Sequence, residues 1–207
     1  MRLGRVCGVC GPGDWLRGHR YCRFQGAARS RPTAYSRIRT GGRATIEFQD
    51  HRDVAGRHDR IASIEMFEAV GERYWPVFLD KLRDRLSVGG RAALQIITIG
   101  DRTFERYRRS IDFIQRYIFP GGVLPSRIAL LREVSEAGLT WLGDQGFGRH
   151  YAETLTAWRH RFAGARGNFA ALGYTDRCRR MWDFYLACCE AGFRTGRTDL
   201  LQISLGR

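Results

Sequence analysis

From about residue 43 onward, short apolar stretches alternate with longer amphipathic ones, and this alternation limits the folds that the chain can adopt. Such an alternation of strands and helices favours an α/β fold with a doubly wound sheet. Ligands of these sheets bind beyond the carboxyl ends of the strands. We therefore expect functional residues just after positions 49, 64 and 95. The expected strands cover 44–48, 60–64, 91–99, 138–146 and 200–205, and the expected helices cover 72–86, 101–118, 126–137, 151–165 and 176–191.

The first 42 residues differ in composition from the rest of the chain. They are dense in Arg, Gly, Cys and Ser, and no helical or strand period runs through them. Lys81 is the only lysine among 35 Lys and Arg residues, which is typical of a GC-rich bacterial genome. Coding DNA of that kind, read in another frame, gives the composition of residues 1–42. We therefore hypothesise that residues 1–42 are an off-frame, disordered segment.

The net charge of +14 would usually indicate nucleic acid or an anionic membrane surface as a partner. Nine arginines and a single acid fall within the first 40 residues, so the rest of the chain is only mildly basic. A rival interpretation makes the N-terminus a zinc site of Cys7, Cys10, His19 and Cys22, with arginines that bind nucleic acid. The Cys10–Cys22 spacing is short for a zinc finger and no second C-x-x-C follows, so we expect neither metal nor nucleic acid.

The sequence also predicts a compartment. No stretch of about 18 consecutive apolar residues is present, so we expect no membrane-spanning helix. The basic N-terminus is not followed by a continuous apolar segment, so we expect no secretory signal. Without such a signal, the six cysteines favour a reduced, cytoplasmic setting.

The segment at 59–71, in which two carboxylates follow an apolar strand, is the most informative for chemistry. Glu65 and Glu68 are three residues apart, so they would share one face if a helical turn begins there. A carboxylate beside an apolar region would orient a polar ligand or act as a base. The alternative interpretation is that both are ordinary acids at a helix N-terminus, where the dipole favours them.

The same segment resembles a known family. Residues 59–71 read D-R-I-A-S-I-E-M-F-E-A-V-G, similar to the family pattern D-R-I-x-S-x-x-M-F-E-x-V-G. The chain resembles the cyclopropane-fatty-acyl-phospholipid synthase and mycolic acid cyclopropane synthase family of S-adenosylmethionine-dependent methyltransferases. Further blocks carry the resemblance in the same order, at 86–90, 117–126, 147–158 and 179–194.

The resemblance implies a class I, Rossmann-like methyltransferase sheet with helices on both faces. It also implies transfer of a methylene or methyl group from S-adenosylmethionine to the cis double bond of an unsaturated acyl chain in a phospholipid. The enzyme would then be cytoplasmic and peripheral to the inner membrane. Methyl transfer to an alkene leaves a carbocation, so a base must remove a proton and water must be excluded. Members of this family are thought to use bound bicarbonate as that base.

The resemblance assigns roles to four residues. Glu68 and Tyr151 match the carboxylate and the hydroxyl that hydrogen-bond bicarbonate, and Ile97 matches a position that contributes its backbone. Gln95 falls where many members have histidine. A glutamine amide still donates a hydrogen bond, but it neither titrates nor carries positive charge. Taken without the resemblance, Gln95 is a buried polar residue whose hydrogen bonds are satisfied by its neighbours, and Tyr151 is a half-buried packing residue.

Other side chains receive weaker assignments. Asp50 and His51 follow the first clear strand, where the resemblance implies a contact with adenine; the alternative is a strand-end carboxylate in solvent. The arginines of the 101–118 helix would meet phospholipid head groups or form a solvated helix face. A set of aromatic residues would surround a lipid tunnel, although such residues are more often plain core. The arginines are Arg102, Arg106, Arg108 and Arg109, and the aromatic residues are Tyr107, Phe113, Tyr117, Phe119, Phe162, Trp182, Phe184 and Tyr185.

The family's glycine-rich cofactor loop has no clear counterpart in this sequence. Class I methyltransferases hold the cofactor on a strand followed by such a loop at a helix N-terminus. Residues 8–13 are glycine-rich, but no apolar strand precedes them and Pro12 would interrupt a following helix. We therefore interpret residues 43–207 as the C-terminal part of a catalytic domain whose N-terminal strands and loop are missing or scrambled. Weak binding of S-adenosylmethionine is expected, and an inactive fragment is the alternative.

Overall fold

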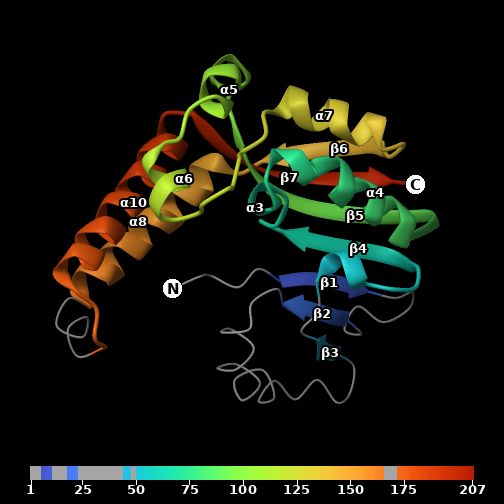
Figure 1. Cartoon of the computed structure of the whole chain (residues 1–207), viewed down its shortest axis with the longest axis horizontal. Helices are drawn as coiled ribbons and strands as arrows, with labels where there is room; N and C mark the ends of the chain where they lie inside the picture. Colours follow the sequence, from blue (N-terminus) through green and yellow to red (C-terminus); the bar gives the residue numbers. More distant parts are fainter. Residues whose placement is uncertain (1–5, 11–17, 23–43, 48–49, 166–171) are drawn as a thin grey trace.

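A seven-stranded sheet runs through the computed structural model, which describes residues 6–10, 18–22, 44–47, 50–165 and 172–207. The strand order is β3-β2-β1-β4-β5-β7-β6 (Figure 1). Strands β2, β3, β4, β5 and β6 run in one direction, and β1 and β7 run in the opposite direction. The strands are β1 (Val6–Cys10), β2 (Gly18–Cys22), β3 (Ala44–Glu47), β4 (His58–Ile64), β5 (Leu86–Ile99), β6 (Thr140–Gly146) and β7 (Thr198–Gly206).

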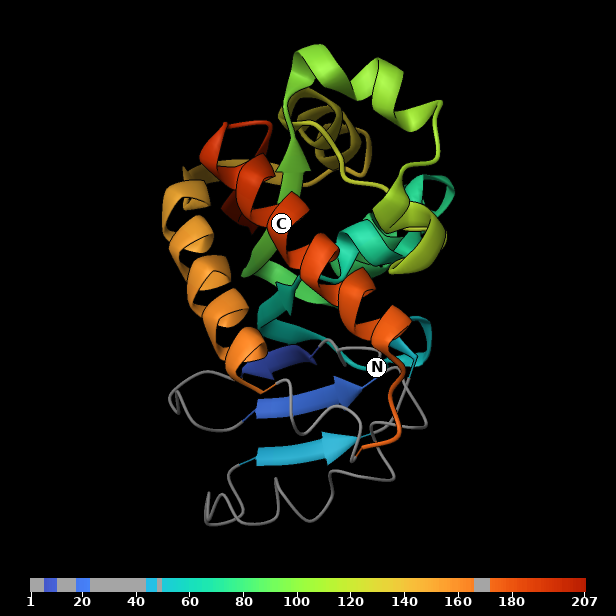
Figure 2. The same cartoon turned by 90° about the vertical axis from the view of Figure 1, so that its left-hand side faces the viewer.

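Helices cover both faces of this sheet, which confirms the predicted α/β architecture. On one face, α4 packs on β5 and α7 packs on β6, whereas α8 and α10 pack on β7 and on each other (Figures 1 and 2). The helices are α3 (Phe67–Val70), α4 (Trp75–Arg85), α5 (Asp101–Arg108), α6 (Phe113–Tyr117), α7 (Arg127–Glu136), α8 (Gly148–Gly164) and α10 (Asp176–Arg194), with short 3-10 helices η1 (His51–Asp53) and η2 (Glu72–Tyr74).

The core is divided by the sheet into two clusters. Successive side chains of a strand point to opposite faces, so β5 contributes to both clusters. Leu94 and Ile96 lie in the larger cluster with α4 and α7, whereas Ile97 packs against the smaller cluster of α8 and α10. Leu200 and Leu201 of β7 divide in the same way. The central strands therefore present one row of residues to each helical layer.

Strand β1 runs against its neighbours. It is antiparallel to both β2 and β4, while β4 and β5 are parallel. Cys10, the last residue of β1, pairs with Arg60 near the start of β4. The carboxyl end of β1 therefore lies at the edge of the sheet opposite the carboxyl ends of β4 and β5. This direction agrees with the prediction that the N-terminal strands are missing or scrambled.

Most predicted elements are present, but two of the predicted helices differ from the observed ones. The helix predicted at 72–86 is a 3-10 turn followed by α4, and it ends before the glycines because Leu86 is already extended. The helix predicted at 101–118 is divided into α5 and α6. The division follows from Asp112, whose carboxylate accepts the Gln115 N–H at 2.8 Å in a capping box that starts a new helix. Ser126 caps α7 as expected, accepting the Ala129 N–H at 3.2 Å.

Candidate functional site

The turn between β4 and α3 places two carboxylates at the carboxyl end of the sheet. Glu65 has a φ of 50°, and among the described residues it is the only non-glycine residue with positive φ. Its N–H donates to the Gln95 carbonyl at 2.8 Å, which ties the turn to β5. Helix α3 begins at Phe67. The expectation that Glu65 and Glu68 share one helix face is therefore wrong, because Glu65 precedes the helix in a left-handed conformation.

Glu68 is buried, with 3% of its surface exposed. Its Oε1 accepts the backbone N–H of Ile97 at 2.7 Å. The predicted contact of the Ile97 backbone with bicarbonate stays a prediction. The Glu68 carbonyl accepts the Val123 N–H at 2.9 Å, which holds α3 against the turn that follows α6. Together, the two hydrogen bonds fix the Glu68 carboxylate at the carboxyl ends of β4 and β5.

Three polar side chains meet beside Glu68. Oε1 of Glu65 accepts one hydrogen bond from Nε2 of Gln95 at 3.2 Å and another from the hydroxyl of Tyr151 at 3.1 Å. Gln202, directly opposite Gln95 on β7, donates from Nε2 to Oε1 of Gln95 at 3.0 Å. The bond from Gln202 orients the Gln95 amide so that its NH₂ group faces Glu65. Glu65, Gln95 and Tyr151, with Glu68 and Ile97, are called the carboxylate site below.

Tyr151 reaches this site from the first turn of α8. The Gly148 N–H donates to Oδ1 of Asp199 at 2.8 Å, which fixes the start of α8 on β7. A Cβ at Gly148 would lie 2.6 Å from the same oxygen, so the position requires glycine. The Tyr151 ring contacts Phe193 edge-on at 4.9 Å. Burial first, and then the charge of Glu65, raise the pKa of Tyr151, so its hydroxyl is a protonated donor at neutral pH.

Part of the predicted aromatic set lies close to the carboxylate site. The Tyr185 ring contacts Trp182 at 5.2 Å and Phe119 at 6.0 Å, and burial raises the pKa of Tyr185, with contributions from Cys189 and Tyr151. Burial also raises the pKa of the Cys189 thiol to about 12, so this cysteine is a thiol at neutral pH. Trp182, Tyr185 and Cys189 thus form an uncharged border along α10, and Phe119 packs against it.

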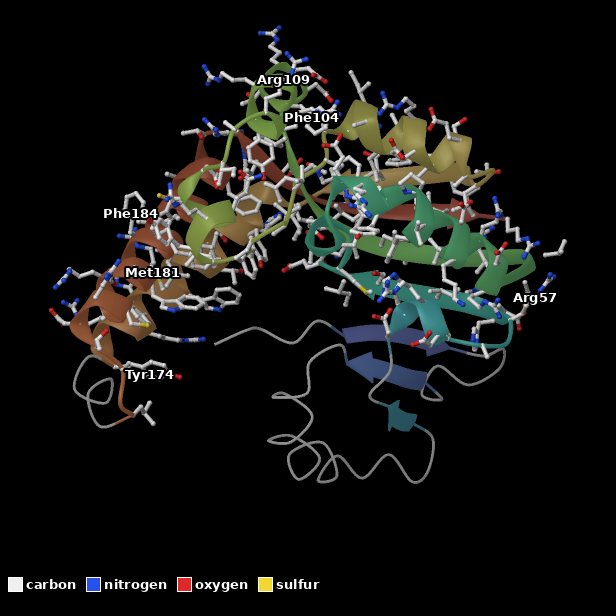
Figure 3. The ribbon with its side chains drawn as sticks, in the orientation of Figure 1. Arg57, Phe104, Arg109, Tyr174, Met181 and Phe184 are labelled. Carbon is white, nitrogen blue, oxygen red and sulfur yellow. The ribbon has the colours of Figure 1, made fainter. Side chains whose placement is uncertain are left out.

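The rest of the aromatic set divides between core and surface. Tyr107 is a buried residue of α5, and its hydroxyl accepts the Leu124 N–H at 3.2 Å. Phe162 packs in the α8–α10 cluster. Phe113 contacts Tyr117 and Phe184, and the last two are more than half exposed. Figure 3 shows Phe184 on the outer side of α10.

Asp50 and His51 lie with Arg52 and Phe78 instead of in the carboxylate site. Asp50 caps η1, and its carboxylate accepts the Arg52 N–H, Nε and Nη2, each at 3.0 Å. The Arg52 guanidinium lowers the pKa of Asp50 to about 2. The His51 ring lies 5.6 Å from the ring of Phe78. The adenine contact stays a prediction.

The predicted arginines differ in their surroundings. Arg108 forms ion pairs with Glu72 and Glu105, whereas Arg102 and Arg106 are exposed. Arg109 extends outward at the tip of α5 (Figure 3), where Glu105 lies 3.5 Å away. Contact with phospholipid head groups stays a prediction for this helix.

Two N-terminal predictions fall outside what the structure describes. Residues 11–13 of the glycine-rich stretch are not among the described residues, and the strands that hold Cys7, Cys10, His19 and Cys22 are described by their backbone alone. Within the described ranges, no group of three or more His, Cys, Asp or Glu side chains is arranged to hold a metal ion. No helix in those ranges is both long enough and apolar enough to cross a membrane.

Sequence reasoning missed the contribution of Gln202 to this region. The signal for Gln202 was the alternation in β7, where Leu201, Ile203 and Leu205 are buried and Gln202 falls on the opposite face. The sequence could not show which partner would lie across from it, because the pairing of β7 with β5 joins residues a hundred positions apart.

Comparisons with known proteins agree with this geometry. The family model for mycolic acid cyclopropane synthetase matches residues 28–203. Tuberculostearic acid methyltransferase UfaA1 of Mycobacterium tuberculosis is 42% identical over 168 residues, which are 81% of this chain and 39% of that protein. Cyclopropane-fatty-acyl-phospholipid synthase of Escherichia coli K12 is 34% identical over 164 residues, which are 79% of this chain and 41% of that protein. The chain thus spans about two fifths of the length of these relatives.

Solved structures give the same answer. The crystal structure of mycolic acid cyclopropane synthase CmaA1 complexed with SAH and CTAB superposes with a TM-score of 0.80 at 25% identity. The superposition covers 90% of this chain and 68% of that one. Since the family model spans most of the chain and the fold agrees, this chain belongs to the mycolic acid cyclopropane synthetase family of S-adenosylmethionine-dependent methyltransferases.

Proposed function

We propose that this chain transfers a methyl or methylene group from S-adenosylmethionine to the cis double bond of an unsaturated fatty acyl chain carried by a phospholipid. The names of its relatives support a lipid substrate, since one is a fatty-acyl-phospholipid synthase and another a tuberculostearic acid methyltransferase. The observation that carries the proposal is the buried Glu68 carboxylate, held on the Ile97 amide beside Glu65, Gln95 and Tyr151.

The chain's own residues suit this chemistry in two ways. An alkene is a weak nucleophile, so positioning supplies much of the rate, and positive charge develops on the acyl chain as the methyl group arrives. Glu68 would stabilise that charge, because a fixed carboxylate in a water-poor site acts more strongly than one in water. The aromatic border of Trp182, Tyr185 and Phe119 would keep water from the carbocation.

The cofactor side of the site fits less well. S-adenosylmethionine would supply an electrophilic methyl group, and the residues expected to hold it follow β1 and β3. Asp50 already accepts three hydrogen bonds from Arg52, and β1 ends at the opposite edge of the sheet. The described residues therefore give the cofactor an incomplete site.

Binding of S-adenosylmethionine is accordingly expected to be weak. Titration calorimetry of the purified chain should give a dissociation constant well above the low-micromolar range, because the described residues include no backbone cradle for the cofactor at the carboxyl ends of β4 and β5. A constant in the low-micromolar range would contradict this expectation. The comparison protein is a full-length relative measured in the same buffer.

Lipid analysis tests the proposed function directly. Purified chain is incubated with vesicles of unsaturated phospholipid and millimolar deuterated S-adenosylmethionine, and the released fatty acids are analysed by mass spectrometry. We expect acyl chains that are heavier by one labelled one-carbon unit. If this chain labels no lipid while a full-length relative labels the same vesicles in a parallel reaction, the inactive-fragment alternative is favoured. The reversed direction of β1 supports that alternative.

Several finer features belong to the same proposal. The enzyme would act in the cytoplasm at the inner face of a membrane, where the exposed arginines of α5 would meet anionic head groups. Residues 43–207 would be the C-terminal part of the catalytic domain, and residues 1–42 an off-frame segment. Reading the upstream DNA in its other frames tests that division: it fails if neither frame encodes a strand with a glycine-rich loop in register. The family match over residues 28–203 argues against a zinc- or nucleic-acid-binding protein.

A further inference from the structure

The carboxylate site already contains a carboxylate of the chain where the resemblance would place bicarbonate. Bicarbonate would need the donors assigned to it, which include the Gln95 amide, the Tyr151 hydroxyl and the Ile97 N–H; the last of these donates to Glu68. The Gln95 amide and the Tyr151 hydroxyl both donate to Oε1 of Glu65, at 3.2 Å and 3.1 Å. An external anion would have to displace the Glu65 side chain from these donors. The backbone of Glu65 is itself anchored, because its N–H donates to the Gln95 carbonyl. The residues present therefore do not fit bound bicarbonate.

The position of Glu65 is maintained at a cost in backbone conformation. Its φ of 50° belongs to the left-handed region, which glycine adopts readily and other residues rarely do. Strained residues of this kind cluster at functional sites. From this turn the Glu65 side chain reaches Gln95 on β5 and Tyr151 on α8.

The two oxygens of Glu65 differ in their surroundings. Oε1 accepts both hydrogen bonds, and within the described part of the chain no donor contacts Oε2. The side chain is partly exposed, in contrast to the buried Glu68. One oxygen thus fixes the carboxylate, and the other is available to take a proton.

We propose that Glu65 is the catalytic base of this chain and replaces bicarbonate in the reaction. The proposal rests on the proposed function. Once the new carbon–carbon bond has formed and the carbon–sulfur bond has broken, Oε2 of Glu65 takes a proton from the carbocation. The electron pair of that C–H bond closes a cyclopropane ring if the proton leaves the added methyl group, or forms a double bond if it leaves a chain carbon. Glu65 then returns its proton to solvent.

The variant Glu65→Gln separates this role from a structural one. The glutamine Oε1 still accepts the bonds from Gln95 and Tyr151, but the side chain no longer takes up a proton. Turnover should fall by about 100-fold or more, the usual contribution of a positioned base. The melting temperature should stay close to that of the parent. The matched control is Glu136→Gln on α7, an exposed acid remote from the site, which should leave turnover unchanged.

The variant Glu65→Gly tests the exchange with bicarbonate. Glycine relieves the positive φ and removes the internal carboxylate, which leaves both donors for an anion. In buffer freed of carbon dioxide the parent should keep its turnover, whereas Glu65→Gly should be inactive until bicarbonate is added. Loss of parental turnover on removing bicarbonate would overturn the proposal, and so would full activity of Glu65→Gln.

A readout without turnover keeps this proposal separate from the proposed function. If the parent modifies no lipid, the proposed function fails, and the melting temperature is measured with bicarbonate against chloride at equal ionic strength and pH. Bicarbonate should raise the melting temperature of Glu65→Gly and leave that of the parent unchanged, because a ligand stabilises only a protein that binds it. Equal stabilisation of both proteins, or of neither, would overturn the assignment.

Discussion

Replacing Phe67 with alanine is expected to lower the free energy of unfolding by about 3–5 kcal/mol, the usual cost of deleting a buried aromatic ring. Phe67 is fully buried, stacks on Trp75 at 5.2 Å and meets Phe78 edge-on at 5.4 Å. Its loss would leave a cavity between α3 and α4 directly beside Glu68. Denaturant unfolding followed by circular dichroism measures the change.

The control for this substitution is Ile128→Ala on α7. Ile128 is 65% exposed, so its truncation should change the free energy of unfolding by less than about 0.5 kcal/mol. A loss below about 1 kcal/mol for Phe67→Ala would mean that the ring is not packed as described. Because Phe67 and Glu68 are adjacent, we also expect the Phe67 variant to lose turnover before it loses its secondary structure.

Replacing Glu68 with glutamine is expected to lower turnover by about 100-fold, with little effect on cofactor binding. The glutamine Oε1 can still accept the Ile97 N–H, so the local structure should persist. The negative charge, which would face the developing carbocation, is lost. Turnover is measured with labelled cofactor and phospholipid vesicles, and cofactor binding is measured by calorimetry on the same preparation.

The two measurements on Glu68→Gln distinguish its role from that of a cofactor ligand. Equal losses of turnover and of cofactor binding would indicate that Glu68 contacts the cofactor and not the acyl chain. The Glu136→Gln variant serves again as the control for removing one negative charge from the protein. A parental rate in Glu68→Gln would argue against a charge-stabilising role.

Much of the fold was predictable because local patterns determine it. The β-branched run at 91–99 and the Ser126 cap produce a strand and a helix start wherever the rest of the chain lies. The break between α5 and α6 was missed because Asp112 acts through a capping box, which competes with helix continuation. The direction of β1 could not be predicted, since it depends on pairings with β2 and β4 that no local signal specifies.

The candidate site was predictable only in part. The resemblance brought Glu68, Ile97, Gln95 and Tyr151 to attention, and the structure places these four together. The position of Glu65 among these residues was missed because the spacing of three suggested a helix that includes it. Tertiary hydrogen bonds to β5 and α8 hold Glu65 in its left-handed turn, and no local pattern specifies them.

The alternation of β5 makes the site unusually sensitive to chain length. Gln95 and Ile97 belong to the carboxylate site, whereas Leu94 and Ile96 lie on the other face of the sheet, in the larger core cluster. A one-residue insertion or deletion early in β5 would exchange the two rows, because the side-chain period of a strand is two. Leu94 and Ile96 would then face Glu65, and the Gln95 amide would be forced into the apolar layer under α4. Lineages of this chain should therefore tolerate length changes in the loops around the strand and exclude them within it.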